Sequence, residues 1–375
     1  MLNRLVIKNY KCFEDFEFEF DSNAHSMLLL GNNGAGKTSL ADALEIFQKI
    51  GRGEGQAGRL ISPAQRWEED GPVELKLSAM LGGVLFEYGF AADFLDRETR
   101  VSTETLRMGD AAMFHREGPE IFLGQGKAGN TISYDPRVLF LPTLHDKDSR
   151  DHVHTFRSWL ANILILSPSP GTFKAEFAES VRWPSRDGSD CVPWLNHILT
   201  SRPKAYAGIE AYLKSLWNDF YTLGIGQVGT EMKRLRLEFK DPASKGKKEF
   251  SPALDILSDG EKCLLLSAMV LAAHEATPSL LCFWDEPDSH LSISEVGQFI
   301  HFLRDAFLTG GQLVAASHNP EVIHAFPESA AWVVGRDNHL SPVKPLKRVS
   351  DVRGSGALPK KADFVHALIA GEIRA

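Results

Sequence analysis

Hydrophobic and polar residues alternate along several segments near the start of the chain. Residues 2–8 and 16–20 are predicted strands, and the Phe-Glu-Phe-Glu-Phe run at 16–20 alternates strictly. A strand with such a pattern has one buried face and one face exposed to solvent. A further alternation, over 73–81, turns at Gly82 and Gly83 into the apolar stretch 84–88. A glycine pair between two such runs predicts a β-hairpin in an antiparallel sheet.

Two further patterns predict buried structure. Residues 27–30 form a continuous apolar run, which predicts a fully buried strand, and Leu40, Leu44 and Phe47 then recur at helical spacing. From residue 254 onward, helical and strand patterns alternate. This alternation is typical of a doubly wound core built on a mainly parallel sheet. The pattern therefore predicts an α/β fold with an antiparallel β-subdomain beside the core.

The middle of the chain has a different composition. Between about residues 150 and 225, Trp and Pro recur among helical stretches. One face of a predicted helix is formed by Tyr206, Ile209, Leu213, Leu216, Trp217 and Phe220. No heptad pattern persists over several repeats, so we expect a compact helical insertion and no long coiled coil. The remaining short elements expected are a strand over 137–141 ended by Pro142, a strand over 232–239 and a terminal helix over 362–369.

Composition narrows the class of protein. The 375 residues are 43% hydrophobic and 24% charged, with a formal net charge of −8, which is typical of a globular protein and argues against a surface that is basic throughout. The four cysteines are scattered without the spacing of a zinc site, so we expect reduced, buried thiols. The N-terminal segment lacks the pattern of a signal peptide, and no apolar run reaches about 18 residues. We therefore expect a cytoplasmic protein without a membrane span.

The strongest chemical signal lies where the strand at 27–30 meets the following helix. There the chain has the pattern G-x-x-x-x-G-K-T, which is the phosphate-binding loop of many nucleotide-binding proteins. The glycines let backbone N–H groups curve around a phosphate, Lys37 adds positive charge for the β- and γ-phosphates, and the Thr38 hydroxyl can bind Mg²⁺. The expected nucleotide-binding residues are Gly31, Asn32, Asn33, Gly34, Ala35, Gly36, Lys37, Thr38 and Ser39.

Two acidic residues end a later apolar strand. The run 280–284 is apolar and leads directly into Asp285 and Glu286. Asp285 is placed to hold a hydrated Mg²⁺ ion, and Glu286 is placed to orient or deprotonate an attacking water. The alternative is a strand capped by acidic turn residues, which the phosphate loop upstream disfavours.

Two shorter motifs accompany these residues. Ser258 and Glu261 have capping-box spacing at the start of an apolar helix, and Gly260 permits close backbone approach. The free N–H groups of such a helix start suit a γ-phosphate, although a capping box alone also explains the motif. The second motif ends an apolar strand at His318, which we expect to contact the γ-phosphate and the catalytic carboxylate.

In this order, the motifs resemble those of an ATP-binding-cassette (ABC) ATPase. The run Ser258-Asp-Gly-Glu-Lys262 is similar to the S-x-G-E-K signature of the RecF/SMC/OLD-like branch, and less similar to the S-G-G-Q of transporter cassettes. The opening Asn9-Tyr-Lys-Cys-Phe13 resembles the N-x-[RK]-x-F element of that branch, in which the basic residue, Lys11 in this chain, faces the nucleotide. The resemblance covers roughly residues 1–90 and 250–335.

The resemblance implies an active site that forms between two subunits around ATP and Mg²⁺. We therefore expect a homodimer closed by ATP, with a higher oligomer left open. The implied catalytic residues are Lys37, Glu286 and His318, and the implied Mg²⁺ ligands are Thr38 and Asp285. The implied cross-subunit residues are Ser258, Gly260 and Asp288, and Glu261 is a further implied nucleotide-binding residue. The implied segments are an N-terminal half of the ATPase head (1–145), the helical insertion (146–230), a C-terminal half (231–345) and a tail with a short helix (346–375).

One family element has no assigned counterpart in the sequence. In the family a glutamine usually links Mg²⁺ to the insertion. Residues 140–148 occupy the expected place without a glutamine, and Gln65 is an alternative at a less certain position. The sequence assigns neither residues 140–148 nor Gln65 to the role of this glutamine.

Three functions are compatible with such a head. The first is a sensor, scaffold or switch ATPase of a bacterial anti-phage or toxin system that works with a separate nuclease or toxin. The missing coiled coil, and the lack of a nuclease pattern after residue 340, favour it. The second is a RecF-like DNA-repair or DNA-clamping ATPase, for which Lys233, Arg234, Arg236 and residues 245–248 would supply a local basic patch. The third, a transporter energy module, is disfavoured by the long insertion and the signature.

Overall fold

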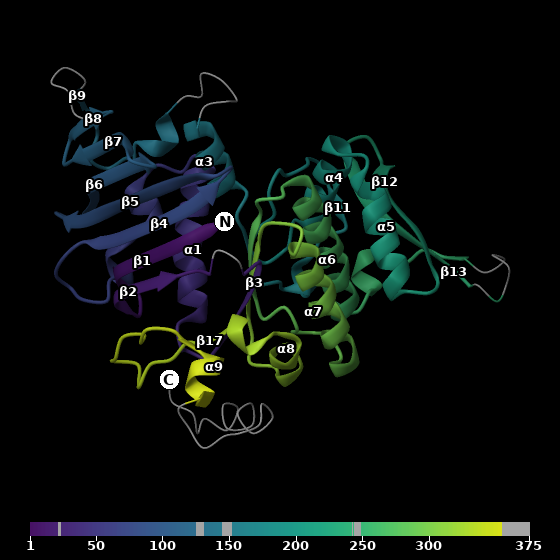
Figure 1. Ribbon diagram of the computed structural model, residues 1–375. Helices are drawn as coiled ribbons and strands as arrows, with labels where there is room; N and C mark the ends of the chain where they lie inside the picture. The colour runs from purple at the N-terminus through teal and green to yellow at the C-terminus, as the bar shows by residue number, and fades with distance from the viewer. Residues whose placement is uncertain (22–23, 125–130, 145–151, 242, 244–248, 355–375) are drawn as a thin grey trace. The chain divides into compact units, whose positions relative to one another are not determined.

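The chain folds into two compact units in a computed structural model, which describes residues 1–21, 24–124, 131–144, 152–241, 243 and 249–354 (Figure 1). Unit 1 comprises Met1–Ile163 and Val314–Ala375, and unit 2 comprises Leu164–Leu313. Each unit has its own helices and strands. The division into four segments that the sequence suggested stays a prediction.

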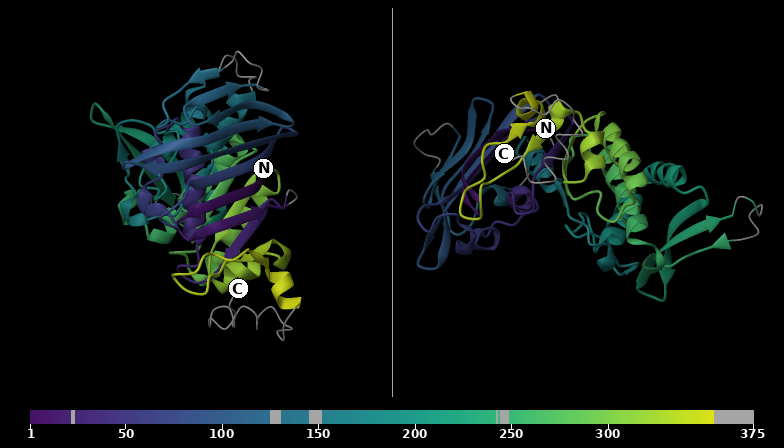
Figure 2. Two further views of the ribbon diagram at one scale, coloured as in Figure 1. Left: turned by 90° about the vertical axis from the view of Figure 1, so that its left-hand side faces the viewer. Right: turned by 90° about the horizontal axis from the view of Figure 1, so that it is seen from below.

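An antiparallel sheet of eight strands dominates unit 1. Its strand order is β2-β1-β4-β5-β6-β7-β8-β9, and these strands run side by side in the left view of Figure 2. The expected hairpin is confirmed, because Leu81 pairs with Val84 and the two glycines between them have φ angles of 57° and 80°, which glycine adopts readily. The strands are β1 (Leu2–Tyr10), β2 (Phe13–Glu19), β4 (Val73–Leu81), β5 (Val84–Leu95), β6 (Glu98–Met108), β7 (Ala111–Glu117), β8 (Glu120–Leu123) and β9 (Thr131–Ser133).

Two helices of unit 1 pack on this sheet through aromatic side chains. Helix α1 (Lys37–Gly51) contributes Phe47, and helix α3 (His152–Ala161) contributes Phe156. The Phe47 ring lies 6.2 Å from that of Tyr88, and the Phe156 ring stacks on Phe86 at 5.3 Å. Phe86 and Tyr88 are two positions apart on β5, so both helices cover the same face of the sheet. The short helix α2 (Ala57–Leu60) follows α1.

A second group of strands in unit 1 surrounds β3 (Ser26–Leu30). Strand β3 pairs in parallel with β17 (Ala331–Val333), and β17 pairs antiparallel with β18 (Lys347–Arg348). All residues of β3 are buried, as expected of a parallel strand covered on both faces. Strand β16 (Gln312–Ala316) ends in unit 1 and is followed by α8 (Pro320–Ala325), while α9 (Val349–Gly354) follows β18.

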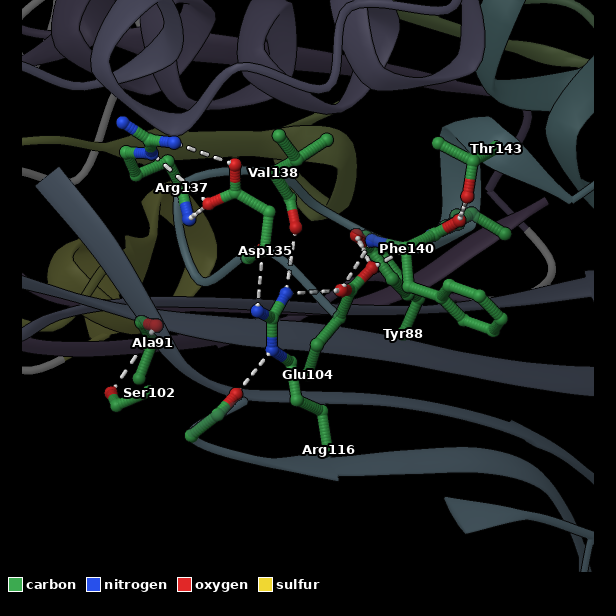
Figure 3. A network of polar contacts seen from close by, with 12 residues as sticks. Tyr88, Ala91, Ser102, Glu104, Arg116, Asp135, Arg137, Val138, Phe140 and Thr143 are labelled. Carbon is green, nitrogen blue, oxygen red and sulfur yellow. Dashed lines mark hydrogen bonds and ion pairs between the residues drawn. The ribbon is translucent and has the colours of Figure 1, made fainter. Parts of the chain in front are cut away.

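The prediction of a short strand over residues 137–141 is wrong. Val138 forms only an isolated bridge, and the next residues enter a 3-10 turn. The amides of Phe140 and Leu141 donate instead to the buried carboxylate of Glu104, at 2.7 and 3.0 Å (Figure 3). Because the carboxylate takes both donors, these amides are not available to a neighbouring strand.

Glu104 lies in a fully buried polar network of unit 1. Its carboxylate also accepts from the Tyr88 hydroxyl at 2.9 Å and lies 3.9 Å from the Arg116 guanidinium (Figure 3). Arg116 donates to the carbonyls of Val138 and Asp135, at 2.7 and 2.8 Å. Burial raises the pKa of the Glu104 carboxyl, and the surrounding donors oppose that shift. The network therefore ties the segment around Val138 to strands β6 and β7.

Unit 2 contains α6 (Asp259–Ala276), whose 18 residues make it the longest helix in the described part of the chain. The Tyr212 hydroxyl on α5 (Ala205–Leu216) lies 3.0 Å from the Ser267 hydroxyl on α6. The predicted helix that would include Phe220 is shorter than expected. Helix α5 ends at Leu216, and Phe220 is the first residue of strand β12 (Phe220–Val228). The other helices are α4 (Cys191–Ser201), α5 (Ala205–Leu216) and α7 (Ile293–Phe307).

The strands of unit 2 form two groups. Strand β10 (Leu164–Leu166) pairs in parallel with β15 (Leu281–Asp285). Strands β12 (Phe220–Val228) and β13 (Met232–Lys240) form an antiparallel hairpin (Figure 1). The short strands β11 (Glu176–Phe177) and β14 (Glu249–Phe250) pair with β13.

Several broad expectations are confirmed. The fold is α/β with an antiparallel subdomain, and no long coiled coil occurs among the described residues. All four cysteines are free and buried. In the same described ranges, no helix combines the length and the apolar character needed to span a membrane. The expected tail helix at 362–369 and the basic loop at 245–248 lie outside the described residues.

Candidate functional site

The phosphate loop joins β3 to α1 within unit 1. Gly34 and Gly36 have φ angles of 78° and 114°, a conformation that side chains disfavour. Gly36 directly precedes α1, and a methyl group added to it would lie 2.7 Å from Val343 Cγ2. A methyl group on Gly31 would lie 2.4 Å from the Val334 carbonyl oxygen. The backbone angle requires glycine at position 34, the packing requires it at position 31, and both require it at position 36.

Lys37 is the first residue of α1 and is only 6% exposed. Its Nζ donates to the Gly31 carbonyl at 2.7 Å and lies 3.4 Å from the Asn32 carbonyl. A buried ammonium group needs such acceptors or an anion to offset the loss of water. The side chain is thereby held against the backbone of the phosphate loop. Thr38 follows it in the first turn of the helix, where free N–H groups favour anions.

The turn between β1 and β2 packs against the same loop. Cys12 Sγ and Phe13 Cζ lie 3.2 and 3.8 Å from the methyl position on Gly36. Between β1 and this contact, Lys11 has a φ angle of 52°, and its Nζ forms an ion pair with Asp42 of α1. Non-glycine residues with such angles concentrate at functional sites. The structure thus brings the Asn9–Phe13 element and the phosphate loop together.

Gln65, the alternative for the missing family glutamine, lies beside this turn. Its carbonyl accepts from the Lys11 amide at 2.6 Å. Its side-chain Oε1 accepts from the Ser62 amide at 2.8 Å, which closes a short 3-10 turn. The competing stretch 140–148 is described only as far as residue 144. Neither candidate is assigned.

His318 follows β16 at the carboxyl end of β3 in unit 1. The amide of the preceding residue, Ser317, donates to the Leu29 carbonyl at 3.2 Å. Ser317 is fully buried, whereas His318 is exposed. The Asn319 side chain then accepts from the Glu321 amide at 2.9 Å and caps α8. The chain therefore changes from a buried strand to a helix at His318, which leaves the imidazole accessible.

The predicted acidic residues follow β15 in unit 2. Asp285 ends the buried strand and is 6% exposed, and Asp288 is 8% exposed. Glu286 has a φ angle of 53°, which is uncommon for a residue with a Cβ atom. The Ser289 amide donates to the Glu286 carbonyl, and the Leu291 amide donates to the Asp288 carbonyl, both at 3.1 Å. A tight turn therefore follows the strand and holds Glu286 in this conformation.

The signature motif begins α6 in the same unit. Ser258 Oγ accepts from the Glu261 amide at 3.3 Å, and the Glu261 carboxylate accepts from the Ser258 amide at 2.7 Å. The capping box is therefore complete. A methyl group on Gly260 would lie 2.8 Å from the His290 carbonyl, and His290 Nδ1 lies 3.7 Å from the Asp259 carboxylate. The signature thus packs against the turn that follows Glu286.

The predicted site residues fall into two groups, one in each unit. Unit 1 holds the phosphate loop, Lys11 and His318, while unit 2 holds Ser258, Gly260, Glu261, Asp285, Glu286 and Asp288. Each group has residue types suited to a magnesium nucleotide: Thr38 offers an oxygen ligand and Lys37 a cation in unit 1, and Asp285 offers a carboxylate in unit 2. The catalytic role of each residue stays a prediction.

Sequence reasoning missed a segment that contacts the phosphate loop. After β17, the chain returns to the loop, so that Arg336, His339 and Val343 all lie near its glycines. One signal was available, because residues 330–334 form an apolar run that ends in Gly335 and Arg336. Functional residues concentrate where parallel strands end, and β17 is parallel to β3.

Comparisons with known proteins concern the fold and the N-terminal segment. Residues 1–54 match the family model of an AAA ATPase domain. A solved SMC head bound to the C-terminal winged-helix domain of ScpA is 13% identical, with a TM-score of 0.57 over 94% of this chain and 99% of that chain. An SMC head with an extended coiled coil, bound to the C-terminal domain of ScpA derived from Pyrococcus furiosus, is also 13% identical, with a TM-score of 0.52 over 94% and 98%. No curated protein sequence matches the chain significantly.

These matches define the fold. At such low identity, the likeness to the solved structures establishes a shared architecture and leaves activity and partners open. The resemblance to ABC-type ATPase heads of the RecF/SMC-like branch is confirmed at this level, by the matched N-terminal segment and by the SMC-head fold.

Proposed function

We propose that this protein binds and hydrolyses ATP and acts as a nucleotide-controlled switch. The observation that carries the proposal is the phosphate loop, in which Lys37 is buried and Gly34 and Gly36 adopt left-handed backbone angles. A loop of this form presents N–H groups and a cation to a polyphosphate. The SMC-head fold supports the same proposal.

Within this proposal, the residues divide the chemistry between them. Lys37 neutralises the β- and γ-phosphates, and Thr38 and Asp285 supply oxygen ligands for Mg²⁺. The bound Mg²⁺ stabilises negative charge on the phosphate oxygens. Glu286 orients or deprotonates the attacking water, and His318 contacts the γ-phosphate.

We also propose that a second copy of the chain completes the site. Ser258 and Gly260 start α6, and the N–H groups and dipole of this helix start suit a γ-phosphate from the partner chain. Two aliphatic side chains are exposed close in sequence to the signature and to the turn that packs on it, Ile256 at 67% and Ile293 at 76%. Exposed apolar groups beside a polar functional surface favour an interface. ATP would then hold two chains together, and hydrolysis would release them.

The proposed switch controls a separate protein. Both solved SMC heads described above are bound to a domain of ScpA. By analogy, we propose an effector such as a nuclease or toxin of a bacterial anti-phage or toxin system. The compact unit 2 supports a head that works without a long coiled-coil arm.

A DNA-binding role of the RecF type is the second candidate, because of the β12–β13 hairpin. Lys233 and Arg236 lie on β13 without an ion-pair partner among the described residues. Arg234, in contrast, pairs with Glu176. Unneutralised cations on a hairpin are suited to phosphate contacts.

The test of the ATPase proposal is Glu286→Gln. Removing a general base is expected to reduce the hydrolysis rate by about 10²- to 10⁴-fold. ATP binding should persist, so the variant should accumulate as a dimer when ATP and Mg²⁺ are present. Light scattering measures the dimer, and phosphate release measures the rate. Glu231→Gln, an exposed position in the turn between β12 and β13, is the matched control.

The outcomes separate the parts of the proposal. Normal hydrolysis by Glu286→Gln would refute the assignment of the base, and a wild-type protein that binds no ATP would refute the function. The tagged variant, purified from its native host with ATP and examined by native mass spectrometry, tests the effector. A stoichiometric nuclease or toxin supports the defence role. ATP-dependent DNA binding that weakens steeply with salt favours the RecF-like role.

A further inference from the structure

A loop at the end of β17 runs beside the phosphate loop of unit 1. We call residues 335–344 the β17 loop. It begins after the Val334 amide, which donates to the Leu30 carbonyl at 2.6 Å. Near its end, the Val343 amide donates to the Cys12 carbonyl at 2.9 Å. The β17 loop is therefore anchored both to the strand before the phosphate loop and to the turn that packs on Gly36.

Hydrogen bonds within the β17 loop define its shape. The Lys344 amide donates to the Gly335 carbonyl at 2.9 Å and closes the base of the loop. At the tip, the Asn338 amide donates to Ser341 Oγ, and the Leu340 amide donates to Asn338 Oδ1, both at 2.8 Å. A loop with such internal bonds holds its side chains in defined positions.

Two side chains of the β17 loop lie next to Gly34. A methyl group on Gly34 would lie 3.5 Å from Arg336 Nη2 and 3.8 Å from His339 Nε2, and no other described atom outside its chain neighbours lies within 4 Å of that position. The Arg336 guanidinium therefore lies close to the backbone of the phosphate loop at Gly34. Glycine is required at position 34 by the left-handed backbone angle, and Arg336 lies at van der Waals distance from it.

The charge of Arg336 is not neutralised by a carboxylate of the described chain. No Asp or Glu among the described residues forms an ion pair with it. The adjacent Asp337 is paired with Lys344 at 2.8 Å. The phosphate loop itself, residues 31–39, contains no acidic residue. A second positive charge therefore lies beside the loop that already contains Lys37, and two such charges favour a polyanion.

We propose that Arg336 binds the phosphate chain of the nucleotide held by the phosphate loop. The guanidinium can give two parallel hydrogen bonds to phosphate oxygens, a geometry that lysine cannot provide. The inference rests on the proposed nucleotide binding and adds a residue from a different part of the sequence. Arg336 is thus a binding residue supplied by the same chain that supplies Lys37.

The test is a titration of the full chain with a fluorescent ATP analogue and Mg²⁺, with inorganic tripolyphosphate as competitor. Arg336→Ala is expected to weaken the affinity for both ligands by about 10- to 100-fold, as for loss of a hydrogen-bonded charge. Arg336→Lys should weaken it less, because the charge remains. Arg59→Ala is the control, since Arg59 is 75% exposed in unit 1 and pairs with Glu54. Lys37→Ala is the reference for loss of the phosphate loop.

The possible results are distinguishable. Unchanged affinity in both Arg336 variants, together with a loss in Lys37→Ala, would overturn the Arg336 assignment and leave the proposed function intact. Weaker ATP binding with unchanged tripolyphosphate binding would overturn the phosphate contact. A wild-type protein that binds neither ligand would overturn both the proposed function and this inference. Thermal unfolding of each variant, compared with Arg59→Ala, checks that the fold is retained.

Discussion

The Ser317 amide donates a hydrogen bond to the Leu29 carbonyl, at 3.2 Å. Leu29 lies two positions before the phosphate loop, and Ser317 directly precedes His318. This one bond therefore aligns two motifs from opposite ends of the sequence at the carboxyl end of β3. Such edges of parallel strands are where ligands of α/β proteins bind.

The first prediction concerns the cross-subunit contact. Ser258→Arg is expected to prevent the ATP-dependent dimer while the single chain still binds ATP, because the longer side chain fills the helix start proposed to meet the partner's γ-phosphate. Loss of the N-cap alone costs about 1 kcal/mol, which is too little to unfold the protein. Light scattering with and without ATP measures dimerisation, and a fluorescent nucleotide measures binding.

Ser133→Arg is the control for this experiment, because Ser133 is exposed on β9. That variant should dimerise like the wild type. A Ser258→Arg protein that forms a normal ATP-driven dimer would contradict the proposed cross-subunit site.

The second prediction concerns the buried network of unit 1. Arg116→Met is expected to destabilise unit 1 by about 3–5 kcal/mol, because it removes the positive charge beside the buried Glu104 carboxylate and leaves the Val138 and Asp135 carbonyls without their donor. Chemical or thermal unfolding measures the effect. Arg107→Met is the control, since the Arg107 side chain on β6 is 49% exposed and should change stability by about 0.5 kcal/mol or less. Equal stabilities of the two variants would show that the network contributes little.

The third prediction concerns the reactivity of two cysteines in unit 2. Burial raises the pKa of both Cys191 and Cys263 from 9.0 to about 12. Only the thiolate reacts with thiol reagents, so labelling of the folded protein should stay slow through pH 9 and accelerate only as the pH approaches 12. Mass spectrometry locates the label on each cysteine.

Denatured protein is the control for this labelling, because both thiols then have ordinary pKa values and should react near pH 9. If folded and denatured protein were labelled at the same rate at pH 8, the two thiols would not be buried in solution.

Local patterns predicted much of the fold and of the candidate site. The hairpin at Gly82 and Gly83 and the capping box between Ser258 and Glu261 depend on residues close in sequence, and both are present in the structure. The prediction of a strand over 137–141 failed because the structure of this segment depends on a residue far away in sequence. The Phe140 and Leu141 amides donate to Glu104, which belongs to a strand distant in sequence. Local strand propensity does not take account of such a competing hydrogen-bond acceptor.

The sequence alone determined the phosphate loop, the acidic strand end and the signature helix start, because each depends on backbone angles and hydrogen bonds within a few residues. The tertiary structure alone decided which distant segments meet. It brought the turn containing Lys11 onto Gly36 and α1, and it placed Arg336 beside Gly34. Such contacts depend on how sheets and loops pack across long separations in sequence, and no residue spacing records that packing.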